Sequence, residues 1–145
     1  MKRMLLVGAA LLIGASAVIA QSDPIAERRT IMKGVGAATR TGTQMVRGET
    51  AFDAAKAKEI LRVYAAAADK THTYFPETSK TGGETTASPK IWESQAEFRK
   101  RFDDWAKEIK AASAQTDTLD EFKVAFGNLT KACGACHQTY RISKS

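Results

Sequence analysis

Apolar residues recur at helical spacing along most of the chain, and turn signals divide the pattern into four long segments. The first begins at Asp23-Pro24, a good cap followed by a residue that the first helical position tolerates. It runs to Met45-Val46 and ends near Gly48. The second runs over residues 51–69. Its apolar side is formed by Phe52, Ile60, Tyr64 and Ala67.

Three glycines interrupt the first predicted helix. Gly34, Gly36 and Gly42 each lower its intrinsic helical stability by up to ~1 kcal/mol. We therefore interpret them as points of close approach, either to another helix or to a bulky cofactor.

The second half of the chain predicts two more helices after a long polar loop over residues 72–88. The third starts around 89–92 and ends near Ser113, and the fourth opens with a capping box from Thr118 to Glu121. The apolar stripe of the third consists of Ile91, Phe98, Phe102, Trp105 and Ile109. The stripe of the fourth consists of Leu119, Phe122, Phe126, Leu129, Cys133, Cys136 and Tyr140, so both cysteines are expected to face the core. No segment alternates like a strand, so the fold class is all-α, an antiparallel four-helix bundle.

The N-terminus has the pattern of a secretory signal peptide. Lys2 and Arg3 precede an apolar run over residues 4–20, which ends in small residues at Ala20. A membrane anchor is the alternative, but the run falls short of the ~20 residues that a span needs. We therefore expect residues 1–20 to be cleaved and residues 21–145 to form one periplasmic domain with no membrane span.

The charge of the chain argues against nucleic acid as a partner. The whole chain carries 22 basic and 16 acidic residues, a net charge of +6. The leader holds two of the basic residues and none of the acidic ones, which leaves 20 against 16, or +4. The basic residues are spread along the helices without a run or an aromatic interleaving, so there is no nucleic-acid footprint. A mildly basic surface suits an acidic redox partner protein.

The two cysteines stand in a motif that predicts covalent haem. Cys133-Gly134-Ala135-Cys136-His137 is the C-x-x-C-H signature of c-type haem attachment. Residues three apart on a helix share a face and lie ~4.5 Å apart along the axis, so two thiols can reach two vinyl groups of one porphyrin. His137 projects from the same side and can be the proximal iron ligand. The prediction is one covalent haem c.

Other interpretations of the cysteine pair are weaker. A disulfide across so short a loop stabilises little. A thioredoxin-like pair opens a helix after a strand, whereas this motif lies near the end of a long helix. A zinc site needs four ligands, and the only other histidine is His72.

Three residues are candidates for the sixth coordination position of the iron. Met32, in the middle of the first predicted helix, would give a His/Met iron with a raised potential. Its alternative role is to fill the core, as methionine often does. Met45, near the helix end, is expected to pack, and His72 is expected to be exposed and not to bind the iron.

These residues and several shorter matches resemble the class II cytochromes c, the cytochrome c′ family. The haem motif stands on the last predicted helix, where this family carries it, and the resemblance covers residues 21–145. The shorter matches are Met32-Lys33, Arg47-Gly48-Glu49, Phe52-Asp53-Ala54-Ala55, Ser88-Pro89-Lys90-Ile91-Trp92 and Tyr140-Arg141.

The resemblance implies roles for individual residues. It implies His137 as proximal ligand and Met32 at the distal position, where a methionine is typical of the low-spin cytochrome c-556 type. Some five-coordinate family members also carry methionine there. Arg28 is similar in position to an arginine near the haem propionates, and Arg141 lies where it can shield the proximal side. Each arginine could equally be a solvated surface charge.

The sequence therefore favours a periplasmic one-electron carrier rather than an enzyme, since no nucleophile–base pair or carboxylate dyad stands out. The alternative is a five-coordinate cytochrome c′ that binds nitric oxide or carbon monoxide. A third interpretation is a haem subunit docked on a larger redox complex. The resemblance is compatible with a monomer or a homodimer.

Overall fold

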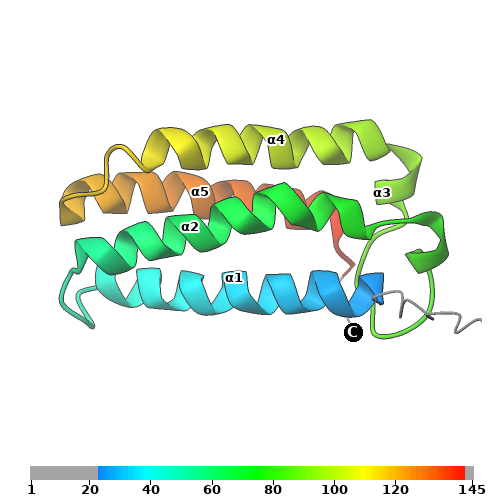
Figure 1. Ribbon diagram of the computed structural model, residues 1–145, viewed down its shortest axis with the longest axis horizontal. Helices are drawn as coiled ribbons and strands as arrows, with labels where there is room; N and C mark the ends of the chain where they lie inside the picture. The colour runs from blue at the N-terminus through cyan, green and yellow to red at the C-terminus, as the bar shows by residue number, and fades with distance from the viewer. Residues whose placement is uncertain (1–22, 143–145) are drawn as a thin grey trace, which may run out of the picture.

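The computed structural model describes residues 23–142, and these residues form an antiparallel bundle of four long helices (Figure 1). The long helices are α1 (Pro24–Val46), α2 (Ala54–Lys70), α4 (Gln95–Ala112) and α5 (Leu119–Tyr140). The predicted all-α four-helix bundle is confirmed. The predicted signal peptide over residues 1–20 lies outside the described residues. Within the described part of the chain, no helix combines the length and apolar character needed to cross a membrane.

The prediction of a single third helix is wrong, because the chain breaks at Ser94. This residue has φ −141° and ψ 53°, which separates the short α3 (Lys90–Glu93) from α4. The indole Nε1 of Trp92 donates to the carbonyl oxygen of Pro76 at 3.2 Å, which anchors α3 to the preceding loop. A contact that helical periodicity does not encode therefore accompanies the break in the apolar stripe.

The loop between α2 and α3 contains two 3₁₀ turns, η1 (Thr71–Tyr74) and η2 (Glu77–Ser79). It lies at the end of the bundle where α1 begins and α5 ends (Figure 1). This arrangement brings the N-terminal turns of α1 and the C-terminal turns of α5 to one end of the molecule.

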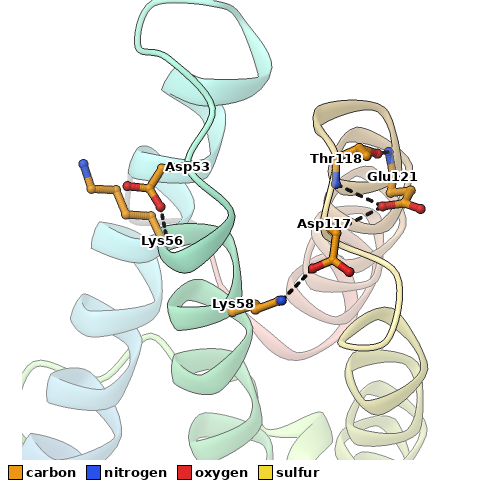
Figure 2. Close-up of polar contacts among 6 residues, drawn as sticks. All are labelled: Asp53, Lys56, Lys58, Asp117, Thr118 and Glu121. Atoms are coloured by element: carbon orange, nitrogen blue, oxygen red, sulfur yellow. Dashed lines mark hydrogen bonds and ion pairs between the residues drawn. The ribbon is translucent and has the colours of Figure 1, made fainter.

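Side-chain caps fix the starts of α1, α2 and α5, as the sequence predicts for α1 and α5. Asp23 accepts from the backbone of Ile25 at 2.9 Å, directly before Pro24. The carboxylate of Asp53 accepts from the backbone of Lys56 at 3.0 Å, so α2 begins at Ala54, later than the predicted start (Figure 2).

The capping box of α5 is complete and lies beside α2. The backbone of Glu121 donates to Thr118 Oγ1 at 3.3 Å, and the backbone of Thr118 donates to the Glu121 carboxylate at 3.0 Å (Figure 2). Lys58 of α2 donates at 2.6 Å to Asp117, the residue directly before Thr118 (Figure 2). Both partners are exposed, so this pair contributes at most about 1 kcal/mol to the stability of the protein.

One of the three glycines of α1 confirms the expected close approach. A Cβ on Gly42 would lie 2.4 Å from Cε2 of Phe126, so α1 and α5 touch there through a glycine and a ring. A Cβ on Gly34 or Gly36 would meet no atom within 4 Å, so neither glycine marks a contact with another helix. The close contact at Gly42 fixes the register of α1 against α5.

The core between the helices is mostly apolar and includes two buried tyrosines, Tyr64 and Tyr140. Tyr64 is fully buried, and its hydroxyl shares a 2.7 Å hydrogen bond with Thr39 Oγ1. Its ring lies 5.4 Å from that of Trp105. The other large side chains in the most buried class are Phe122, Met45, Leu61, Ile91, Ile109 and Leu129.

Tyr64 predicts an alkaline limit to stability. Burial raises the pKa of Tyr64 to about 12, whereas an unfolded tyrosine ionises near ~10. The stabilisation from the neutral phenol is complete below pH ~10 and is lost as the pH rises toward ~12, an effect on the order of 2 kcal/mol. We expect Tyr64→Phe to flatten this slope in urea unfolding between pH ~9 and ~12, and to cost about 1 kcal/mol at neutral pH through the lost hydrogen bond. Tyr74→Phe, at a half-buried position, is the control, and an equal flattening in both variants would contradict the assignment.

Candidate functional site

The two cysteines lie in the last turns of α5, at the edge of the core. Cys133 and Cys136 are free thiols, each half-buried and packed against the apolar cluster. Cys133 Sγ donates to the carbonyl oxygen of Leu129 at 3.3 Å. Both cysteines face the core, as expected, and they lie at its edge.

The environment keeps both thiols protonated at neutral pH. Burial raises the pKa of Cys133 to about 11, with a further contribution from Cys136. Burial also raises the pKa of Cys136, although the positive charge of Arg101 opposes it. A redox-active thiol needs a lowered pKa and zinc binds the thiolate, so neither alternative suits these sites. Within residues 23–142, no group of three or more histidine, cysteine, aspartate or glutamate side chains gathers as a metal site.

His137 follows directly on the more exposed side of α5. Partial burial lowers the pKa of its imidazole, and the nearby positive charge of Arg141 lowers it further. Both effects favour the neutral imidazole, the form that binds a metal. Arg141 is exposed, and its backbone N–H donates to the carbonyl oxygen of His137 at 3.1 Å. The structure thus places Arg141 beside the predicted proximal ligand.

The register of α1 against α5 brings Met32 to the level of the motif. The two helices run antiparallel (Figure 1). They touch where Gly42 meets the ring of Phe126. Met32 lies ten residues before Gly42, and Cys136 lies ten residues after Phe126. At 1.5 Å per residue, both positions are about 15 Å from the contact, on the same side of it. Met32 therefore lies at the same height along the bundle as Cys136 and the next residue, His137.

The two methionines of the described chain have different surroundings. Met45 is 1% exposed and belongs to the core, as predicted. Met32 is only half-buried and lies outside the cluster of packed apolar residues. The interpretation of Met32 as a core-filling residue therefore loses support.

Two polar residues have surroundings that the sequence did not indicate. His72 is half-buried rather than exposed: its ring lies 6.0 Å from that of Phe102, and its Nδ1 is 3.4 Å from the Ala68 carbonyl oxygen. Arg28 is 5% exposed and donates to the loop between α2 and α3 at Ser79 and Thr85. No spacing rule links these loop residues to Arg28. The sequence marked Arg28 only through the resemblance to the cytochrome c′ family, and it marked the loop only by its length.

The residues present fit a covalently attached haem. Two free, protonated thiols stand one helical turn apart, and a neutral imidazole follows immediately. A half-buried thioether lies at the same level on the facing helix. Apart from the porphyrin nitrogens, a haem iron takes only two axial ligands, which matches a site with few protein donors.

A family model described as Cytochrome C′ matches residues 23–141, essentially the whole described bundle. The chain belongs to the cytochrome c′ family. Its cofactor is therefore a covalently attached haem c. The expected family is confirmed, together with its cofactor.

The relatives carry different names within the family. A cytochrome c′ from Rhodopseudomonas palustris is 39% identical over 128 residues, which cover 86% of each chain. A cytochrome c-556 from the same organism is 31% identical over 145 residues, which cover 97% of each chain. A solved structure of R. palustris cytochrome c′ matches with a TM-score of 0.83 and 38% identity, covering 86% of this chain and all of that one.

Proposed function

We propose that this chain is a periplasmic one-electron carrier whose haem iron is ligated by His137 and Met32. Cys133 and Cys136 hold the haem through thioether bonds, and the leader over residues 1–20 directs export. The observation that carries the proposal is the half-buried Met32, outside the packed core and level with the haem motif. Bound haem supplies an iron that accepts and returns one electron.

Each residue of the site has a distinct task in this function. The thioethers fix the haem against α5, so that reduction and oxidation do not release it. Partial burial and the charge of Arg141 hold His137 in its neutral, binding form. A thioether opposite an imidazole favours the reduced iron and raises the potential. The function requires no acid, base or nucleophile, so we propose a carrier rather than an enzyme.

Redox partners would meet a mildly basic protein. With the leader removed, the chain carries a net charge of +4, so an acidic periplasmic partner would be attracted over long range. This attraction weakens with salt, because the screening length is only about 8 Å at physiological ionic strength.

Binding of nitric oxide or carbon monoxide is the second candidate function. It is favoured by the relative named cytochrome c′, which is 39% identical, against 31% for the relative named cytochrome c-556. In that case Met32 would not bind the iron, and the distal side would be open to a gas. The two functions differ in one coordination bond.

The absorption spectrum of the holoprotein tests the proposal. We expect a low-spin spectrum in both oxidation states that carbon monoxide does not change. Met32→Ala is expected to give a high-spin spectrum that shifts with carbon monoxide, together with a lower potential, because the thioether is lost. Met45→Leu is the matched control, since that methionine is part of the core and should leave the spectrum unchanged. A wild-type spectrum that is already high-spin and responds to carbon monoxide would refute Met32 as ligand and favour gas binding.

A further inference from the structure

Arg28 is a buried charge whose hydrogen bonds all run to the loop between α2 and α3. Its Nη1 donates to the carbonyl oxygen of Tyr74 at 3.0 Å and to Ser79 Oγ at 2.9 Å. Its Nη2 donates to the carbonyl oxygen of Ser79 at 3.1 Å and to Thr85 Oγ1 at 2.6 Å. The guanidinium also lies 4.6 Å from the centroid of the Phe75 ring.

All four acceptors of the Arg28 guanidinium are neutral oxygens. The stability of this buried charge therefore depends on each of them. A buried charge is tolerated only while hydrogen bonds replace the water that it has left. Removing an acceptor leaves the guanidinium partly unsolvated, a larger penalty than the loss of an ordinary surface hydrogen bond. The loop is therefore held firmly to α1 at this point.

The same loop is bound to the end of α5. The backbone of Ser88 donates to the carbonyl oxygen of Tyr140 at 2.9 Å. The backbone of Ile142 donates to the carbonyl oxygen of Thr86 at 2.9 Å. We call residues 79–88 the strap, because they connect the first turns of α1 with the last turn of α5.

Thr85 joins the two attachments. Its Oγ1 accepts both from the Arg28 guanidinium at 2.6 Å and from the backbone of Ala87 at 3.1 Å. The next residue after Ala87 is Ser88, which bonds to α5. Three hydrogen bonds and the peptide bond between Ala87 and Ser88 thus link the side chain of Arg28 to the end of α5.

The two ends of this path lie next to the two proposed iron ligands. Arg28 is four residues before Met32, one helical turn along α1. Tyr140 is three residues after His137 on α5. The separation of the two helices at the haem end is therefore set, in part, by the strap.

We propose that Arg28 is a positioning residue, which acts through the strap to hold Met32 within bonding reach of the haem iron. The inference rests on the proposed His137/Met32 ligation. An arginine is required because its planar fork serves several acceptors at fixed angles, whereas the ammonium of a lysine is a single point charge on a flexible stem.

Two variants test this proposal in the holoprotein. Arg28→Lys keeps the charge and removes the fork. Thr85→Val removes the Oγ1 atom that accepts from both Arg28 and Ala87, and it leaves α1 unchanged. This second variant tests the proposal even if Arg28→Lys does not fold. In both variants, hydrogen exchange of peptides spanning residues 79–88 and 138–142 is expected to accelerate by about tenfold or more, the equivalent of one charged hydrogen bond. The same variants should show a high-spin fraction and bind carbon monoxide.

Arg29→Gln is the matched control. Arg29 is the next residue along α1, and it forms an ion pair with Glu84 of the strap in which both side chains are largely exposed. Exposed pairs contribute little, so we expect neither the exchange nor the spectrum to change.

The outcomes separate this proposal from the proposed function. Faster exchange together with a high-spin fraction in both variants supports the positioning role. Faster exchange with a low-spin spectrum unmoved by carbon monoxide shows a strap that does not act on Met32, and it overturns the proposal while leaving the ligation intact. Unchanged exchange also overturns it. A wild-type spectrum that is high-spin refutes the ligation itself and this inference with it.

Discussion

Replacing both Cys133 and Cys136 by alanine is expected to abolish covalent haem attachment. Acidified acetone should then extract all pigment from the protein, whereas the wild-type chain should keep its colour after denaturation. The reason is that these two half-buried thiols are the only cysteines of the chain, and each would supply one thioether bond. Denaturing gels stained for haem give the measurement.

The single variants sharpen this prediction. Cys133→Ala or Cys136→Ala leaves one thiol, so we expect the haem to stay attached through one thioether with a shifted pyridine haemochrome spectrum. Gln138→Ala, at an exposed position close to both cysteines, should keep normal attachment. Haem that resists extraction from the double variant would show that another residue holds it, and the assignment of the site would fail.

Loss of the haem should also lower the stability of the bundle. A group that binds only the folded chain stabilises it, so the double variant is expected to unfold at a lower temperature than the wild type. The thiols lie at the edge of the apolar cluster, and Cys133 donates to Leu129, so their environment is already part of the packed structure. Circular dichroism of both proteins during heating measures the difference.

The second large effect is expected at Gly42. Gly42→Val should destabilise the protein by about 3 kcal/mol and lower its melting temperature by roughly 10 °C. A Cβ there would lie 2.4 Å from the Phe126 ring, which is 6% exposed and lies 5.2 Å from the ring of Phe122. The ring has little room to retreat, so α1 and α5 must separate. Urea unfolding of the holoprotein measures the change.

Two further substitutions serve as controls for this close contact. Gly42→Ala is expected to cost less than the valine variant, because the smaller clash is offset by up to ~1 kcal/mol of helix propensity. Gly127→Ala should be neutral or stabilise by up to ~1 kcal/mol, since a Cβ on this neighbour of Phe126 meets no atom within 4 Å. A Gly42→Val protein as stable as the wild type would refute the close approach of α1 and α5.

The features that the sequence alone determined are those encoded by near neighbours. The caps at Asp23 and Thr118 act over two or three residues, and they lie where the sequence places them. The apolar stripes repeat every three or four residues, which is enough to predict the bundle and the helix that carries the cysteines. The C-x-x-C-H motif predicts haem because its spacing places two thiols and an imidazole on one side of a helix, where they can reach one porphyrin.

The tertiary structure decided whatever depends on residues far apart in the sequence. The break at Ser94 accompanies a bond between Trp92 and Pro76, which no helical periodicity encodes. Nothing in the sequence around Arg28 indicates that it is buried. Its hydrogen-bond acceptors belong to a loop about fifty residues later in the chain. Of the three glycines of α1, only Gly42 meets a ring, because the packing of α5 selects it. Local interactions therefore determined the helices and the haem motif, whereas long-range packing determined the register of the helices and the surroundings of Met32.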